Sequence, residues 1–219
     1  MINVCDNCGE YRIDKKIDPI RSVAICPLCQ HPHPFRQQPL YFVCGPSGSG
    51  KSAVCQLLTG QLSDVIPLDS DILWQPAFNQ PEESFRSFFE TWLRMAKNIG
   101  QSGKPALIFS AGGIPANVEP CIERRYFTQV HYLAFVCDED ELARRLRHRP
   151  TWRGSRDSRF IDGQLGYNRW LKQSGPAARV AIELLDTTNQ TAVRTAEAVK
   201  TWLKAKAVAE VVASTADAR

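Results

Sequence analysis

The chain has 219 residues, of which 43% are hydrophobic and 23% charged, and its formal net charge is +4. These fractions are typical of a globular protein, and no apolar run approaches the roughly 18 residues that a membrane-spanning helix needs. The N-terminus has neither the basic flank nor the apolar core of a secretory signal. We therefore expect a cytoplasmic protein without a membrane partner, consisting of one ordinary α/β domain and a small extra module.

Four of the eight cysteines form two C-x-x-C pairs at the start of the chain, Cys5 with Cys8 and Cys26 with Cys29. In a reducing compartment such pairs more often bind metal than form disulfides, and this spacing suits a tetrahedral Zn²⁺ site. The sequence thus predicts a zinc ribbon with a structural role. We expect the proline-rich segment 31–39, with its two histidines, to be a linker.

Beyond the linker, apolar runs alternate with amphipathic segments. The runs predict buried strands at 40–44, 106–109, 130–136 and 182–185, with another strand ending at Asp69. Helices are predicted at 52–58, 82–99, 139–147 and 191–208. This alternation predicts an α/β fold of three layers around a parallel sheet. We expect the ribbon and linker at 1–38, the α/β domain at 39–206 and a frayed tail at 207–219.

A complete G-x-x-x-x-G-K-[ST] motif follows the first of these strands and precedes a helix, the context that this motif requires. Its residues are Gly45, Pro46, Ser47, Gly48, Ser49, Gly50, Lys51 and Ser52. The glycines let backbone N–H groups turn toward phosphates, Lys51 reaches the terminal phosphate oxygens, and Ser52 offers its hydroxyl to Mg²⁺. The motif predicts binding of a nucleoside triphosphate, taken as ATP, with Mg²⁺.

Two carboxylates, Asp69 and Asp71, follow the second predicted strand. Ligands of open α/β sheets bind at the carboxyl ends of the strands, so these groups are expected beside the phosphates. A second acidic run, Asp138-Glu139-Asp140-Glu141, resembles the Mg²⁺-binding strand end of motor ATPases. We interpret it as the start of a helix, where acids are favoured, and the guanine-reading Asn-Lys-x-Asp motif of GTPases is absent.

From Tyr41 onward the chain resembles the small P-loop kinases, the family of adenylate, nucleoside, shikimate and gluconate kinases. The resemblance rests on the phosphate loop, the Asp69-x-Asp71 pair, the segment 107–115 with Gly112 and Gly113, and the arginine-rich segment 145–150. It implies Asp71 as the group that orients or deprotonates the phosphate-accepting hydroxyl and Asp69 as a partner of Mg²⁺. It also implies a mobile lid near 145–165.

The same resemblance implies roles for residues outside the phosphate loop. Arg145 and Arg149 would be catalytic, together with Lys51 and Asp71, and would also contact ATP. Because they are four residues apart, we expect them on one helix face, directed at the same phosphates. The other residues expected to contact the phosphate acceptor are Trp74, Arg86, Gly113 and Arg153.

The segment after the third strand, 112–117, lacks the acid and the arginine with which nucleoside monophosphate kinases bind their acceptor. An uncharged hydroxyl acceptor, such as a nucleoside or a sugar-like compound, therefore fits better. The leading hypothesis is a Mg-ATP-dependent small-molecule kinase that acts on a nucleoside or nucleotide. One alternative is a nucleic-acid end kinase or a nucleic-acid-linked P-loop ATPase whose ribbon grips the polymer, and another is an ATP-binding regulator. Basic and acidic residues nearly cancel in the ribbon, which disfavours nucleic acid. The sequence specifies no oligomeric state.

Overall fold

The structure is a computed structural model that describes residues 2–216, with the side chains of Arg153 and of 211–216 outside the description. The strands are Lys16–Asp18 (β1), Val23–Ile25 (β2), Pro32–Pro34 (β3), Gln38–Cys44 (β4), Ile66–Asp69 (β5), Ala106–Phe109 (β6), Phe127–Val136 (β7) and Ile182–Asp186 (β8). The α-helices are Lys51–Leu58 (α1), Arg86–Gly100 (α2), Pro115–Val118 (α3), Glu139–Arg147 (α4), Ser158–Ser174 (α5) and Ala192–Ala216 (α6). Short 3₁₀ turns are Ser70–Leu73 (η1), Pro76–Phe78 (η2), Pro81–Glu83 (η3), Ile122–Tyr126 (η4) and Thr151–Arg153 (η5).

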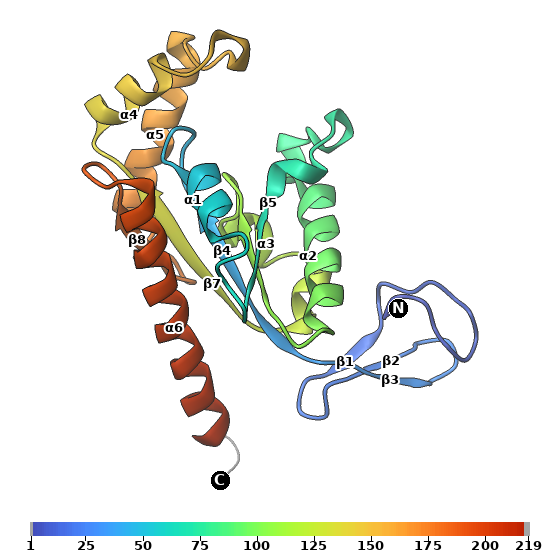
Figure 1. The fold of residues 1–219 in the computed structure, drawn as a ribbon. Helices are drawn as coiled ribbons and strands as arrows, with labels where there is room; N and C mark the ends of the chain where they lie inside the picture. The colour runs from blue at the N-terminus through green and yellow to red at the C-terminus, as the bar shows by residue number, and fades with distance from the viewer. Residues whose placement is uncertain (1, 217–219) are drawn as a thin grey trace.

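Five strands form a parallel sheet in the order β5-β6-β4-β7-β8. β4, which precedes the phosphate loop, is the central strand, and its Val43 is paired with Phe109 on one side and Leu133 on the other. All five strands end at the same edge (Figure 1). The predicted three-layer α/β fold is confirmed, and its topology gathers the loops after β4, β5 and β6 at one place.

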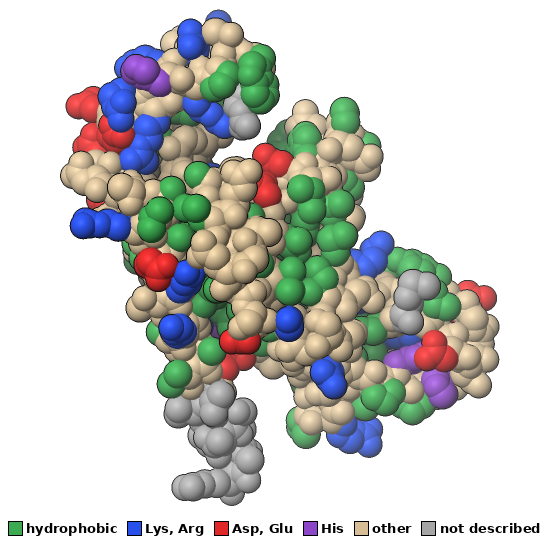
Figure 2. Space-filling model, viewed as in Figure 1, with side chains coloured by type: hydrophobic (Ala, Val, Ile, Leu, Met, Phe, Trp, Pro, Cys, Tyr) green, Lys and Arg blue, Asp and Glu red, His purple; other side chains and the backbone are tan. Residues whose placement is uncertain are grey.

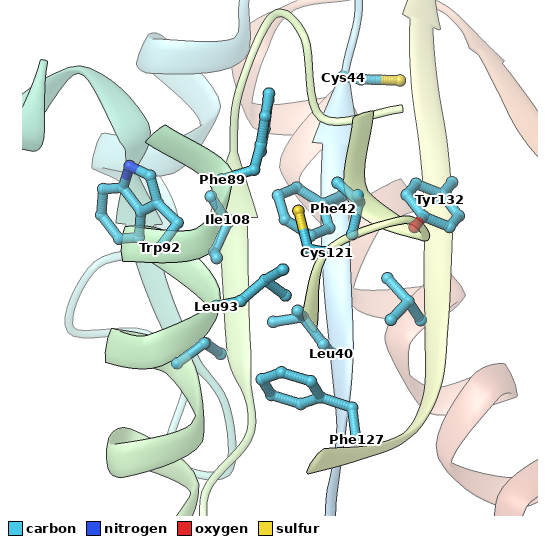
Figure 3. Packing of buried hydrophobic residues seen from close by; sticks show 14 of the residues in the cluster. Leu40, Phe42, Cys44, Phe89, Trp92, Leu93, Ile108, Cys121, Phe127 and Tyr132 are labelled. Atoms are coloured by element: carbon cyan, nitrogen blue, oxygen red, sulfur yellow. The ribbon is translucent and has the colours of Figure 1, made fainter. Parts of the chain in front are cut away.

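The two faces of the sheet are covered by different helices. Leu40 and Phe42 on β4 pack with Phe89, Trp92 and Leu93 of α2, as Figure 3 shows. The alternate residues of β4 face α1 and α6 instead. This alternation follows from the period of two along a strand, and both faces are apolar because both are buried.

The N-terminal ribbon is a separate antiparallel sheet in the order β1-β2-β3. The expected linker is wrong in part, because Pro32–Pro34 forms β3 and His33 is paired with Ala24. Prolines lack a donor N–H and are tolerated here because β3 is an edge strand. His33 is therefore a buried ribbon residue rather than a linker residue.

The ribbon packs against the C-terminal half of α2 and against η4 (Figure 1). Ile2, Ala24 and Phe35 belong to the same buried cluster as the sheet residues that α2 covers. The rings of Phe35 and Tyr126 lie 5.2 Å apart, and Arg125 donates to the carbonyl oxygen of Ile13 at 3.1 Å. The ribbon and the α/β domain thus share one hydrophobic core.

Two helices differ from their expected bounds. α2 begins at Arg86 rather than near residue 82, because Ser84 and Phe85 adopt left-handed φ angles of 55° and 54° that interrupt the helix. α6 continues to Ala216 and runs past the end of the sheet (Figure 1), so the tail expected from residue 207 is helical as far as the structure describes it. Its alanines favour the helix. Within residues 2–216, no helix has the length and apolar character needed to cross a membrane.

Candidate active site and metal centre

The phosphate loop connects the end of β4 to the start of α1. Gly45 has a φ of 134°, and a Cβ there would collide with the carbonyl oxygen of Phe135 on the neighbouring strand. Gly48 and Gly50 have φ angles of 85° and 98°, and Gly50 is the N-cap of α1. These left-handed angles suit glycine, and the loop delivers the backbone N–H groups of a helix N-terminus to one place.

Lys51 lies half-buried at the base of this loop. Its ammonium group donates to the carbonyl oxygens of Gly45 and Pro46 at 2.7 and 2.9 Å. Burial lowers the pKa of Lys51 to about 8, an effect that the charges of Asp69 and Asp71 oppose. Binding of an anion beside Lys51 is therefore favourable, because its negative charge offsets the loss of hydration around the ammonium group.

Asp69 and Asp71 lie at the end of β5, across the cleft from the phosphate loop. Asp69 caps η1, where its Oδ1 accepts from the backbone N–H of Asp71 at 3.0 Å. The indole N–H of buried Trp92 holds the carbonyl oxygen of Ser70 between them at 3.2 Å. The turn that presents the two carboxylates is thus fixed from both sides.

These groups line one cleft of about 440 Å³. Figure 2 shows a hollow between the region of α4 and η5, where basic side chains gather, and the segment formed by η1 to η3 and the start of α2. The cleft is lined by Ser47, Gly48, Gly50, Lys51, Ser52, Ala53, Asp69, Asp71, Phe109, Ala111, Arg145, Arg149, Pro150 and Trp152. Cations, backbone N–H groups and two carboxylates therefore converge on a single space.

A second cavity of about 430 Å³ lies on the other side of the phosphate loop. Its walls include Gly48, Ser49, Arg144, Arg145 and the loop after β8. Arg145 lines both cavities, and its guanidinium donates to the carbonyl oxygens of Thr187 and Thr188 at 2.7 and 2.9 Å and to Glu141 at 2.7 Å. Arg145 thus joins α4 to the loop after β8 and, like Gly48 and Gly50, lines both cavities.

Arg149 lines the same cleft as Arg145 but not on the same helix. The expectation of a shared helix face is wrong, because α4 ends at Arg147 and Pro150 follows. The residue before a proline disfavours the helical region, so the chain leaves the helix there. Arg153 belongs to the turn η5, within the segment expected to form a lid, and its side chain lies outside the described part of the structure.

Three residues predicted to contact the phosphate acceptor do not line the cleft. Trp74 is 45% exposed and packs edge-on against Phe88, with their ring centroids 5.2 Å apart. Arg86 starts α2 and lies beside the thiol of Cys121. Gly113 packs so closely on Phe42 that a Cβ would collide with the ring, so this glycine serves packing.

The acidic run after β7 behaves as a helix start. Asp138 is the N-cap of α4 and accepts from the backbone N–H groups of Asp140 and Glu141 at 3.0 and 3.2 Å. The carboxylate of Glu141 pairs with the guanidinium groups of Arg144 and Arg145, which lower its pKa to about 2. The run therefore orders α4 and its arginines.

Sequence reasoning missed several residues near the cleft. Trp152 lines it although 78% of the residue is exposed, and Phe109 and Ala111 line it from the end of β6. The available signal for Trp152 was an aromatic residue within an arginine-rich segment. Gln164 was missed as well, and its Oε1 accepts from the backbone N–H of Ser47 at 2.7 Å.

The four cysteines of the ribbon converge as a metal centre would require. Their sulfur atoms all lie within 4.8 Å of one another, with Cys5 and Cys29 3.5 Å apart and Cys8 and Cys26 3.9 Å apart. Tetrahedral Zn²⁺ with bonds of 2.3 Å places its sulfur ligands about 3.8 Å apart, so the residues fit zinc. The Nε2 atom of buried His33 lies 3.3 Å from the Cys5 sulfur, as an outer group that orients a ligand would.

Comparison with known proteins identifies the fold. No protein-family model and no curated protein matches the sequence. Among solved structures, a sugar kinase from Janibacter sp. matches with a TM-score of 0.56 and 16% identity, over 77% of this chain and 95% of that one. The Mycobacterium tuberculosis APS kinase CysC, in complex with AMPPNP and APS, matches with a TM-score of 0.54 and 17% identity, over 78% and 99%. The chain therefore has the fold of the P-loop kinases, preceded by a small ribbon with a four-cysteine cluster.

Proposed function

We propose that this protein transfers the γ-phosphate of Mg-ATP to a hydroxyl group of a small molecule, with a nucleoside as the favoured acceptor. The observation that carries the proposal is one cleft lined by the phosphate loop, Arg149 and the Asp69–Asp71 pair. Phosphoryl transfer requires positioning and charge neutralisation more than covalent chemistry, and these residue types supply both. The match to an APS kinase in complex with AMPPNP supports ATP as the phosphate donor.

The two cavities would hold different parts of the reactants. The second cavity, which is lined by Arg145 and the loop after β8 and is called the base-side cavity below, would take the nucleoside part of ATP. The phosphate loop would hold the phosphates, with Lys51 and Arg149 balancing their charge. Ser52 and Asp69 would hold Mg²⁺, which when bound neutralises further charge on the triphosphate.

At the far end of the cleft, Asp71 would orient the acceptor hydroxyl and take up its proton. The apolar part of the cleft lining includes Phe109, Ala111 and Trp152. An uncharged acceptor with an aromatic face suits this combination, because it loses little hydration and its hydroxyl meets a carboxylate. This supports a nucleoside over a monophosphate.

The nucleic-acid end kinase has less support. In the ribbon, Arg12 donates twice to Asp14, at 2.8 and 2.6 Å, and Arg21 donates to Asp18 at 2.8 Å. Arginines already paired with acids contribute little to phosphate binding, which needs a net basic surface. Salt-dependent retention of an oligonucleotide in a gel shift would favour this alternative.

A coupled assay of ADP release tests the proposal against nucleosides, nucleoside monophosphates, sugars and 5′-hydroxyl oligonucleotides. We expect Asp71→Asn to lower kcat by about 100-fold or more while ATP affinity is kept, since the general base is lost. Lys51→Ala should lose ATP binding, and Asp64→Asn, an exposed change after α1, should have no effect. ADP release that ignores every acceptor and survives Asp71→Asn would overturn the assignment.

A further inference from the structure

Helix α5 carries the chain back from the lid and touches three loops of the sheet edge through side chains on one face. Gln164 accepts from the backbone N–H of Ser47 in the phosphate loop at 2.7 Å. Tyr167 donates to the carbonyl oxygen of Ala111, in the loop after β6, at 2.7 Å. Asn168 is buried and makes two hydrogen bonds to the backbone of Cys137, after β7, at 3.1 and 2.8 Å. Positions i, i+3 and i+4 share a helix face, so α5 fixes three loops at once.

The contact to Ser47 differs from the other two because it holds the phosphate loop itself. Ser47 lines the cleft with Asp69, Asp71 and Arg149, but not the base-side cavity. It therefore belongs to the side of the loop that faces the carboxylates. Under the proposed function, the terminal phosphate of ATP lies on this side, because it must meet the acceptor hydroxyl at Asp71.

From this geometry we propose that Gln164 is a positioning residue for phosphoryl transfer. Its amide oxygen anchors the Ser47 end of the phosphate loop to α5, and so sets the shape of the loop where the γ-phosphate lies. The inference rests on the proposed function and extends it, since Gln164 does not line the cleft. This contact uses the oxygen of the side chain, because a backbone N–H can only donate.

The anchor also gives the lid a defined base. The lid turn η5 lies between α4 and α5, and Gln164 is near the middle of α5. The buried contact of Asn168 holds the same helix one turn further on. Movement of the lid is thereby confined to residues before this anchor, while the loop that cradles the phosphates keeps its shape.

Two variants of Gln164 separate the anchor from mere packing. Gln164→Met has nearly the same length and helix propensity but no strong acceptor, and Gln164→Glu keeps an oxygen in place. Hydrogen exchange of the Ser47 amide, followed by NMR, should be slow in the wild type and in Gln164→Glu and fast in Gln164→Met. Tyr167→Phe removes a hydrogen bond from the same helix face to another loop, and its Ser47 amide should stay protected.

Nucleotide binding then tests the position of the anchor. Calorimetry with ADP and with AMPPNP should show that Gln164→Met loses about fivefold to tenfold in AMPPNP affinity, the effect of one hydrogen bond, and little in ADP affinity. Tyr167→Phe should leave the ratio of the two affinities unchanged. The unfolding temperature of Gln164→Met should stay near that of the wild type, because the side chain is only half-buried.

The outcomes separate this inference from the function on which it rests. If the wild type binds both nucleotides and Gln164→Met weakens both equally or neither, the positioning role is wrong and the proposed function stands. An unprotected Ser47 amide in the wild type also overturns the positioning role. If the wild type binds neither nucleotide, the proposed function is wrong and the role of Gln164 falls with it.

Discussion

The carboxylate of Glu123 and the ammonium group of Lys97 form an ion pair that is buried between the ribbon and α2. The other Glu123 oxygen accepts from Asn3 of the ribbon at 3.0 Å and from Arg94 of α2 at 3.1 Å. Lys97 also lies 3.9 Å from the ring centroid of Tyr126. Three parts of the chain, namely the ribbon, α2 and η4, thus meet at one carboxylate.

This pair leads to a prediction about stability. Burial lowers the pKa of Lys97 to about 8, and the charge of Glu123 opposes that shift. Glu123→Gln keeps the shape but leaves Lys97 without its counter-charge, so we expect the free energy of unfolding to fall by about 3 to 5 kcal/mol. Urea unfolding measures this loss, and Glu83→Gln, at an exposed site in η3, is the matched control. A loss below about 1 kcal/mol would show that the pair does not stabilise the docking of the ribbon.

Zinc removal should destabilise the whole chain. The cluster of Cys5, Cys8, Cys26 and Cys29 fits one ion, and ribbon residues share the core of the α/β domain. A ribbon of this size depends on its metal to fold, so a chelator or Cys26→Ser should lower the single unfolding midpoint by about 10 °C or more. Metal analysis should find one zinc per chain in the wild type and in Cys55→Ser. Two separate transitions, with the second unaffected by chelation, would contradict a shared core.

Local chemistry made the centre of the fold predictable from the sequence. The apolar run before Gly45 predicts β4. The motif that ends at Ser52 predicts the phosphate loop and the start of α1, because it occurs between a strand and a helix. The two C-x-x-C pairs likewise come together because the antiparallel pair β1 and β2 lies between them in the sequence. These features depend on residues close in sequence, whose spacing is visible directly.

What the sequence did not reveal depends on contacts between distant segments. Gln164 and Ser47 are 117 positions apart, and nothing in either neighbourhood indicates the other. Trp74 is predicted to contact the acceptor because it follows Asp71, whereas in the structure it packs against Phe88 and does not line the cleft. Which of several aromatic rings pack together is decided by the arrangement of α2 on the sheet.

The pKa of Lys51 predicts how ATP binding depends on pH. Burial lowers this pKa to about 8, whereas in the complex the phosphates favour the protonated form. Below pH 8 the free protein already carries the proton, so affinity should be constant. Above pH 8 binding must take up a proton, so affinity should weaken by up to tenfold per pH unit. Calorimetry between pH 7.5 and 9.5, where the ATP phosphates are already ionised, measures this. Lys51→Arg, which stays charged, should give a flat profile, and an equal slope in both proteins would exclude Lys51 as the titrating group.

The exposed ring of Trp152 provides a probe of lid closure. It lines the cleft from η5 while 78% of the residue is exposed, so closure of the proposed lid over ATP should remove much of that ring from water. Tryptophan emission should therefore shift to shorter wavelength when Mg-ATP is added, and Trp152→Phe should abolish most of the shift. Trp170→Phe is the matched control, because Trp170 stacks on Tyr167 and does not line the cleft. A shift that survives in Trp152→Phe and disappears in Trp170→Phe would place the moving surface on α5 instead of the lid.

Trp152 should also affect how well the closed site excludes water. We expect Trp152→Ala to raise ATP hydrolysis relative to transfer to the acceptor, since the lid then excludes water less well.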